Sequence, residues 1–140
     1  MGSKLLVVAD STKAQFYQVM GHKIKTLLGD YDADTFNIGH ERAEKKSSFN
    51  NKTGVAGHSF EPHTTPKEAD RSEFSKKLSE LIYHTKQNGE YAELMLIAEP
   101  KMLGAIRKNL DGKLGHCISK EIPKDMAGAD PKILETLLFE

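Results

Sequence analysis

The sequence predicts an α/β domain with a five-stranded mixed sheet and helices on the faces of that sheet. Three observations support this prediction. The run Leu94–Ala98 is short, unbroken and apolar, which is typical of a strand buried on both faces. Pro100 then begins a segment with apolar residues at helical spacing. A second short apolar run, Lys4–Ala9, opens the chain.

The N-terminal part of the chain predicts an antiparallel meander of three strands. Lys4–Ala9 is the first, and an Asp-Ser-Thr turn signal begins at Asp10. The mixed apolar and aromatic segment Ala14–Met20 is expected to be the second. A Gly-His turn then leads into the third, Lys23–Leu28, which alternates in part between polar and apolar residues.

A long loop is expected at about residues 33–65. Within it, Gly39–Thr65 contains no Leu or Ile and shows no periodicity of a strand or helix. Loops of this length in compact domains are typically functional or disordered. A capping box at Thr65–Glu68 then begins a helix predicted over Pro66–Asn88. Its apolar stripe consists of Phe74, Leu78, Leu81 and Ile82.

The C-terminal part predicts a helix, an edge strand and a last helix after the central strand. The apolar positions of the first helix are Met102, Leu103, Ile106 and Leu110, and Gly112 stands where a C-terminal cap is expected. His116–Ile122 reads as the edge strand, ended by Pro123. Asp130 and Pro131 begin the last helix as its cap and first residue, with Ile133, Leu134, Leu137 and Leu138 as its apolar face.

The order of these elements determines the expected topology. A right-handed crossover through the helix 66–88 places the central strand beside the first strand and parallel to it. The sheet order is then 3-2-1-4-5, a ribonuclease-H-like arrangement in a single domain over residues 1–140. The predicted core residues are Leu6, Val8, Phe74, Leu78, Leu96, Ile97, Ile106 and Leu137.

Composition limits the classes of function. Lys plus Arg and Asp plus Glu both number 20, so the formal net charge is zero. This balance argues against binding to DNA or an anionic membrane by bulk charge, although a local patch remains open. The single cysteine, Cys117, excludes an internal disulfide and fits a reducing compartment. Without an apolar run of membrane-spanning length or a signal-peptide pattern, we expect a cytoplasmic protein that does not enter the membrane.

Four segments of the chain stand out together: LLVVADSTKAQFY, DRSEFSKKLSELI, LMLIAEPKMLGAIRKNL and KEIPKDM, followed by a Leu-rich C-terminal helix. Together they resemble the bacterial host attachment protein family, the "protein required for attachment to host cells". The resemblance covers nearly the whole chain, and LMLIAEPKMLGAIR is its most specific part. Lys124 and Asp125 match the Lys-Asp of the family pattern.

The layout is also distantly similar to the middle domain of eukaryotic and archaeal peptide-release factors. That resemblance implies a release-factor-like fold and an association with ribosomes or transfer RNA. In the release factors, the loop before the long helix carries Gly-Gly-Gln, which enters the peptidyl-transferase centre. This chain has Gly57-His58-Ser59-Phe60 in that region and no Gly-Gly-Gln anywhere. Direct hydrolysis of peptidyl-tRNA is therefore not expected.

Cations and histidines of the region Gly39–Arg71 are the candidates for contact with RNA or a partner. Mobile cations suit phosphate contacts, but nearby carboxylates nearly balance them, and a solvated loop is the alternative interpretation. The candidates are Arg42, Lys45, Lys46, Lys52, His58, His63, Lys67 and Arg71.

Other chemistry-bearing residues give weaker hypotheses. Asp10 ends the first strand, where nucleases with such a sheet place a metal-binding carboxylate; its potential partners are Asp30, Asp32 and Asp125. His58, Glu61 and His63 match no standard metal-site spacing, so no metal or other cofactor is predicted. Cys117 and His116 would point to opposite faces of a strand, which favours a buried structural thiol over a catalytic pair.

The sequence thus favours a non-catalytic binding domain associated with translation through a ribosome or structured RNA. A protein–protein interaction domain linked to host attachment, with a homodimer contact, is the first alternative. A metal-dependent nuclease is the second.

Overall fold

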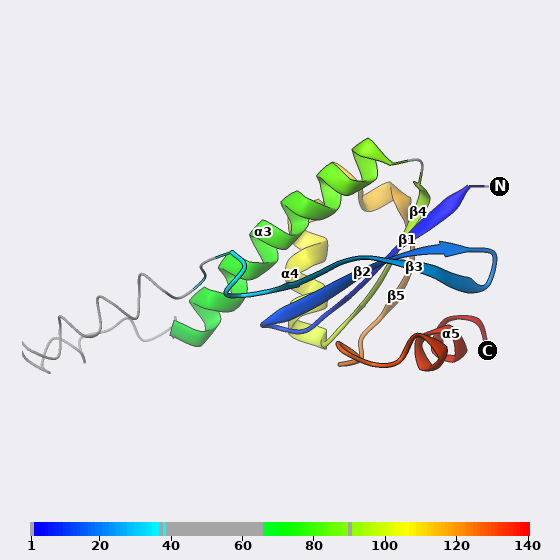
Figure 1. Ribbon diagram of the computed structural model, residues 1–140. Coiled ribbons are helices and arrows are strands. Elements are labelled where there is room, and N and C mark those ends of the chain that lie inside the picture. The colour runs from blue at the N-terminus through cyan, green and yellow to red at the C-terminus, as the bar shows by residue number, and fades with distance from the viewer. Residues whose placement is uncertain (1, 37, 39–65, 90) are drawn as a thin grey trace, which may run out of the picture.

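The computed structural model describes residues 2–36, 38, 66–89 and 91–140, with the side chains of Pro66 and Lys67 left out. One mixed sheet runs through it in the order β3-β2-β1-β4-β5 (Figure 1). Its strands are β1 (Ser3–Ala9), β2 (Lys13–Met20), β3 (Lys23–Asp32), β4 (Tyr91–Ala98) and β5 (Ile118–Ile122). β1–β2 and β2–β3 pair antiparallel, whereas β1–β4 and β4–β5 pair parallel. The predicted sheet order is therefore confirmed.

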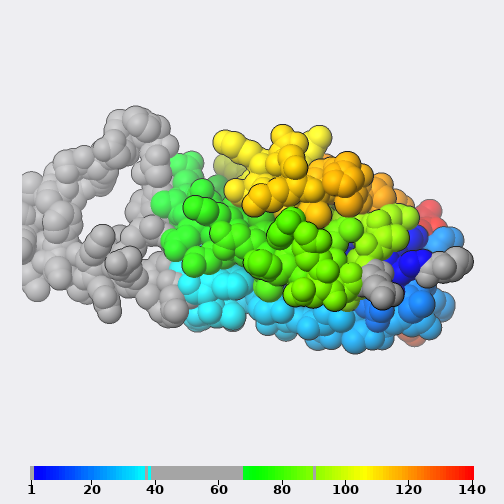
Figure 2. Space-filling view, turned by 90° about the horizontal axis from the view of Figure 1, so that it is seen from above, coloured from blue at the N-terminus to red at the C-terminus, as the bar shows by residue number. Residues whose placement is uncertain are grey.

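The helices divide between the two faces of the sheet. Both α3 (Pro66–Asn88) and α4 (Pro100–Leu110) cover one face, and the short α5 (Pro131–Phe139) lies on the other (Figure 1). Figure 2 views the molecule from the α3 side and shows α3 and α4 next to one another across the surface. No helix in the described part of the chain is both long and apolar enough to cross a membrane.

Strand side chains alternate between two apolar layers. In β1, Leu5 and Val7 pack toward α3 and α4, whereas Leu6 and Val8 pack toward α5. In β4, Leu94 and Leu96 share the first layer, and Met95 and Ile97 share the second. Because both faces of these central strands are covered, their sequences are unbroken apolar runs rather than alternating ones.

The start of α4 shows how the sequence fixes a helix end. Glu99 is the N-cap, and its carboxylate accepts the backbone N–H of Met102 at 2.9 Å. Pro100 occupies the first turn, where its missing N–H costs nothing. Gly112, after the last turn, has φ +87°, a conformation in which residues with a Cβ are strained. Pro100 and Gly112 match the prediction, whereas the cap by Glu99 is a finding of the structure.

Several boundaries differ from the prediction. β3 is longer than expected, because it continues to Asp32 and pairs with β2 over its whole length. β5 is shorter, because Gly115–Cys117 forms a 3₁₀ turn. The prediction that His116 and Cys117 lie in a strand is therefore wrong, and Cys117 is half-buried against the first layer.

α5 buries a narrower stripe than predicted. Leu134 and Leu138 are buried, whereas Leu137 is only partly buried and Ile133 is 53% exposed. Among the helices in the described part of the chain, α5 is the one on this face, and Met126 and Ala129 of the preceding connection pack beside it. The other predicted core residues are buried: Leu6, Val8, Phe74, Leu78, Leu96, Ile97 and Ile106.

Tyr17 lies in the α5-side layer and is 6% exposed. Burial, followed by the negative charges of Asp30 and Asp130, raises the pKa of Tyr17 above its ordinary value near 10. The unfolded chain therefore ionises this phenol first as the pH rises. The folded state holds the proton longer, so the free energy of unfolding should fall as the pH rises above about 10.

We expect Tyr17→Phe to reduce this alkaline loss of stability. Urea unfolding of both proteins in a pH series from about 8 to 11 measures it, and the quantity compared is the slope above pH 10. Equal slopes in the two proteins would contradict the assignment to Tyr17.

Candidate nucleic-acid interface

Arg71 is the one predicted RNA-contact residue whose side chain lies in the described part of the chain. Lys67 belongs to the first turn of α3, with its side chain outside the described residues. The remaining candidates also lie outside the described residues: Arg42, Lys45, Lys46, Lys52, His58 and His63. The described part of the interface is therefore built from Arg71 and its neighbours.

Arg71 lines a pocket of about 470 Å³ between α3 and α4. We call this pocket and its walls the α3–α4 groove. From α3 the groove takes Glu68, Arg71, Ser72 and Ser75, and from α4 it takes Lys101, Ala105, Lys108 and Asn109. Residues that are distant in the sequence thus share one concave surface.

A polar link holds the two walls of the groove. The Asn109 side-chain amide donates to the Ser75 hydroxyl at 3.3 Å and to the Ala105 carbonyl at 2.9 Å. The Ser75 hydroxyl in turn donates to the Ser72 carbonyl at 2.8 Å, and Ser75 is buried. Buried polar atoms in satisfied networks keep a fixed geometry, so the spacing of the walls is defined.

The groove carries more cations than carboxylates. Arg71, Lys101 and Lys108 line it together with the single acid Glu68. The Arg71 Nε atom is buried and has no hydrogen-bond partner among the described atoms. The Arg71 guanidinium and two exposed lysines line the groove together, and such groups are donors suited to phosphate oxygens.

The exposed surface of α4 continues this positive charge. It presents Lys101, Arg107 and Lys108, and Lys113 follows in the next turn. Arg107 lies 3.4 Å from the Glu121 carboxylate, but its side chain is 66% exposed, so this ion pair contributes little to stability. Asp111 and Glu121 lie beside these cations, so the excess of positive charge is confined to the exposed face of α4 itself.

Sequence reasoning missed Lys101, Lys108 and Asn109. They occupy the exposed positions of an amphipathic helix whose buried positions were identified correctly. The residues of α4 outside its apolar stripe could have indicated a basic surface. They include cations and an amide but no acid. The zero net charge of the whole chain conceals this asymmetry.

Two of the carboxylates proposed for a nuclease, Asp10 and Asp32, accept hydrogen bonds from nearby residues of their own turns. The Asp10 carboxylate accepts the backbone N–H groups of Thr12 and Lys13, both at 2.8 Å, as in an Asx turn. Hydrogen bonds from the Thr35 backbone and hydroxyl lower the pKa of Asp32. Within the described residues, no cluster of three or more His, Cys, Asp or Glu side chains could hold a metal ion.

Other predicted residues lie far from the groove in the fold. Lys124 and Asp125 are exposed in the connection between β5 and α5, on the other side of the sheet from α3 (Figure 1). That connection is tied to β2, because the Gly128 N–H donates to the Gln15 side chain at 2.8 Å. Asp30 lies at the same face and accepts from Gln15 at 3.2 Å. These residues form no site with Arg71.

Comparisons with known proteins cover nearly the whole chain. Residues 5–138 match the family described as "Protein required for attachment to host cells". An uncharacterized protein of Rickettsia prowazekii, RP470, is 33% identical over 141 residues, covering 97% of this chain and 92% of that protein. The family match runs from within β1 to within α5 and therefore spans both helices of the α3–α4 groove.

Proposed function

This chain belongs to the family of proteins required for attachment to host cells, and we propose a molecular function for it on the basis of the α3–α4 groove. The description of the family names a phenotype and no molecular activity. The domain binds structured RNA without catalysing a reaction. The RNA belongs to the translation machinery and is either ribosomal RNA or transfer RNA. The region Gly39–Arg71 and the α3–α4 groove form the contact surface. Arg71 belongs to both.

The arrangement of Arg71, Lys101 and Lys108 around one groove is the observation that supports this proposal most directly. Phosphate contacts supply most of the affinity in non-specific binding to nucleic acid, and they need cations on one face rather than a high net charge. The hydrogen bond from the exposed Asn109 to the buried Ser75 links the two walls, so the cations of both helices are presented together.

The translation setting depends on the similarity to release-factor middle domains, which is an analogy at the level of fold. The order of meander, long helix and strand–helix–strand unit in the described residues supports that analogy. The chain contains no Gly-Gly-Gln, and its Gly57 is followed by His58 and Ser59. Binding without peptide release therefore fits the residues better than hydrolysis.

Neutralising the groove should weaken RNA binding. The test variant combines Arg71→Gln, Lys101→Gln and Lys108→Gln, and a matched control combines Lys23→Gln, Lys25→Gln and Lys132→Gln, three exposed lysines away from the groove. Fluorescence anisotropy with transfer RNA at several salt concentrations measures Kd. Loss of three phosphate contacts should reduce the slope of log K against log salt by roughly 2 to 3 and weaken binding at least about tenfold, while the control stays near the wild type.

Equal losses in the two triple variants would show that only overall charge matters, and the groove assignment would fail. Co-sedimentation of the tagged wild-type protein with ribosomes, repeated at raised salt, tests the setting. Loss of co-sedimentation at raised salt is expected for phosphate contacts.

A protein–protein interaction domain is the second candidate. Exposed apolar side chains favour it, because Met20, Leu27 and Leu28 are 42%, 52% and 37% exposed on β2 and β3. β3 is also an edge strand of the sheet, which could pair with the same strand of a second copy in a homodimer. Co-sedimentation that survives raised salt and the groove variant would favour this candidate over RNA binding.

A further inference from the structure

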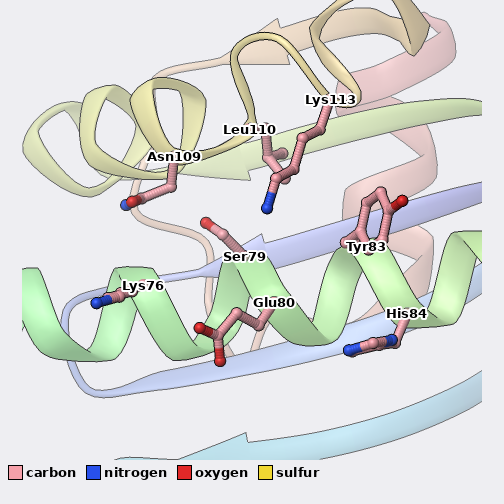
Figure 3. Close-up of a pocket in the computed structure, with 8 residues that line it drawn as sticks. All are labelled: Lys76, Ser79, Glu80, Tyr83, His84, Asn109, Leu110 and Lys113. Atoms are coloured by element: carbon pink, nitrogen blue, oxygen red, sulfur yellow. The ribbon is translucent and has the colours of Figure 1, made fainter.

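A second pocket lies between α3 and α4, toward the C-terminal ends of both helices (Figure 3). Its volume is about 400 Å³. Ser79 and Leu110 are its buried residues, and the exposed Lys76, Lys113 and Asn109 stand around them. Asn109 also lines the α3–α4 groove, so the two pockets adjoin. We call this one the Ser79 pocket.

Ser79 is the unusual member of this pocket. It is 4% exposed, and its hydroxyl is buried with no hydrogen-bond partner among the described atoms. Ser75, one turn earlier, is equally buried, but its hydroxyl is bonded to Ser72 and Asn109. Figure 3 shows the Ser79 side chain projecting from α3 toward α4, with its hydroxyl between Asn109 and Lys113. Leaving such a hydroxyl unpartnered costs free energy, so its position indicates a missing partner.

Positive charge surrounds the same space. The Lys113 ammonium lies 5.4 Å from the centroid of the Tyr83 ring, a cation–π contact that holds it at the mouth of the pocket. Lys113 is fixed by the turn after α4, where its N–H donates to the Leu110 carbonyl at 3.0 Å. Lys76 adds a second cation from α3, against the single acid Glu80. With His84 neutral, the formal charge of the lining residues is positive.

We propose that the Ser79 pocket binds one phosphate group. The Ser79 hydroxyl donates a hydrogen bond to one phosphate oxygen, and Lys76 and Lys113 pair with the others. These donors come from α3 and from the turn after α4, which suits a tetrahedral anion better than a planar carboxylate. The two lysines are exposed and have rotatable stems, so both can turn toward a phosphate held by Ser79.

The phosphate can come from an RNA strand that continues from the groove past Asn109, or from a free nucleotide. The first source rests on the proposed function, whereas the second does not. The chemistry that recognises the group is the same in both cases, and the experiment separates the sources.

The test is an amide NMR titration of the full chain with inorganic phosphate, adenosine monophosphate and a short single-stranded RNA. Phosphate should shift the amide signals of Ser79 and Lys113. Ser79→Ala and Lys113→Gln should each weaken phosphate binding about tenfold, the value of one charge-assisted hydrogen bond. Ser119→Ala and Lys132→Gln, which make the same chemical changes at exposed positions elsewhere, should leave it unchanged.

A second readout separates a ligand-binding hydroxyl from a structural one. Because the Ser79 hydroxyl has no partner, Ser79→Ala should keep or raise the Tm while it weakens phosphate binding. A lowered Tm with unchanged phosphate binding would overturn the proposal. So would the absence of shifts at Ser79 and Lys113 with every ligand.

The outcomes distinguish this proposal from the function proposed above. If RNA binds normally to Ser79→Ala and Lys113→Gln and these variants also bind inorganic phosphate as the wild type does, the phosphate site is wrong and the RNA-binding groove stands. If RNA binds normally to the variants but their phosphate binding is weakened, the site stands and its phosphate comes from a free nucleotide. If inorganic phosphate and the mononucleotide bind in the pocket but RNA does not bind the chain, the phosphate site stands and the RNA proposal fails.

Discussion

Phe74→Ala should lower the free energy of unfolding by about 3–5 kcal/mol. Phe74 is fully buried where α3 packs on the sheet, and its ring centroid lies 5.7 Å from that of Phe36. Removing the ring leaves a cavity in the layer that positions α3 beside α4. Urea unfolding followed by circular dichroism measures the change.

Lys77→Ala is the matched control on the same helix, because Lys77 is exposed. It should change the free energy of unfolding by no more than about 0.5 kcal/mol. A loss below about 1 kcal/mol for Phe74→Ala would mean that α3 packs on the sheet less tightly than described.

Ile97→Ala should cost about 2–5 kcal/mol, on the opposite face of the sheet. Ile97 is fully buried in β4 and belongs to the layer that contains Leu134 and Leu138 of α5. Because that layer has a single short helix over it, the prediction also tests whether α5 packs firmly. The same unfolding measurement applies.

Ile133→Ala makes the identical chemical change at a residue that is 53% exposed on α5. It should leave stability within about 0.5 kcal/mol of the wild type. Similar losses for Ile97→Ala and Ile133→Ala would contradict the arrangement of α5 on the sheet.

Much of the fold could be predicted from local patterns. The apolar runs of β1 and β4 indicated strands buried on both faces, and the two strands pair in parallel as expected. Pro100 and Gly112 marked the ends of α4, because fixed φ and positive φ are properties of single residues. The sheet order followed from the handedness of crossovers, which is nearly invariant.

Local sequence patterns gave wrong element boundaries or burial where contacts with other elements determine them. The length of β3 depends on pairing with β2, which continues to Asp32 although the apolar alternation ends earlier. His116 and Cys117 have strand-like neighbours, but the turn after α4 closes as a 3₁₀ turn. Leu137 is only partly buried although its spacing fits the apolar stripe, because its burial depends on how α5 is turned on the sheet, which the sequence of the helix cannot show.

The interface divides in the same way. The sequence identified Arg71 as a candidate cation, but most of its predicted companions lie outside the described residues. Its partners in the groove, Lys101 and Lys108, come from another helix, and the sequence offered no reason to join them to Arg71. The unpartnered hydroxyl of Ser79 is likewise invisible in the sequence, where it is one polar residue in a helix.

The sequence by itself determined the α/β class, the sheet order and most of the buried residues, because strand and helix patterns arise from contacts that repeat every two or 3.6 residues. The tertiary structure alone decided which cations face one another across α3 and α4 and which serine lacks a partner. Those properties depend on how two helices pack side by side on the sheet. The exposed residues of one helix do not predict which residues of the other helix lie across the groove.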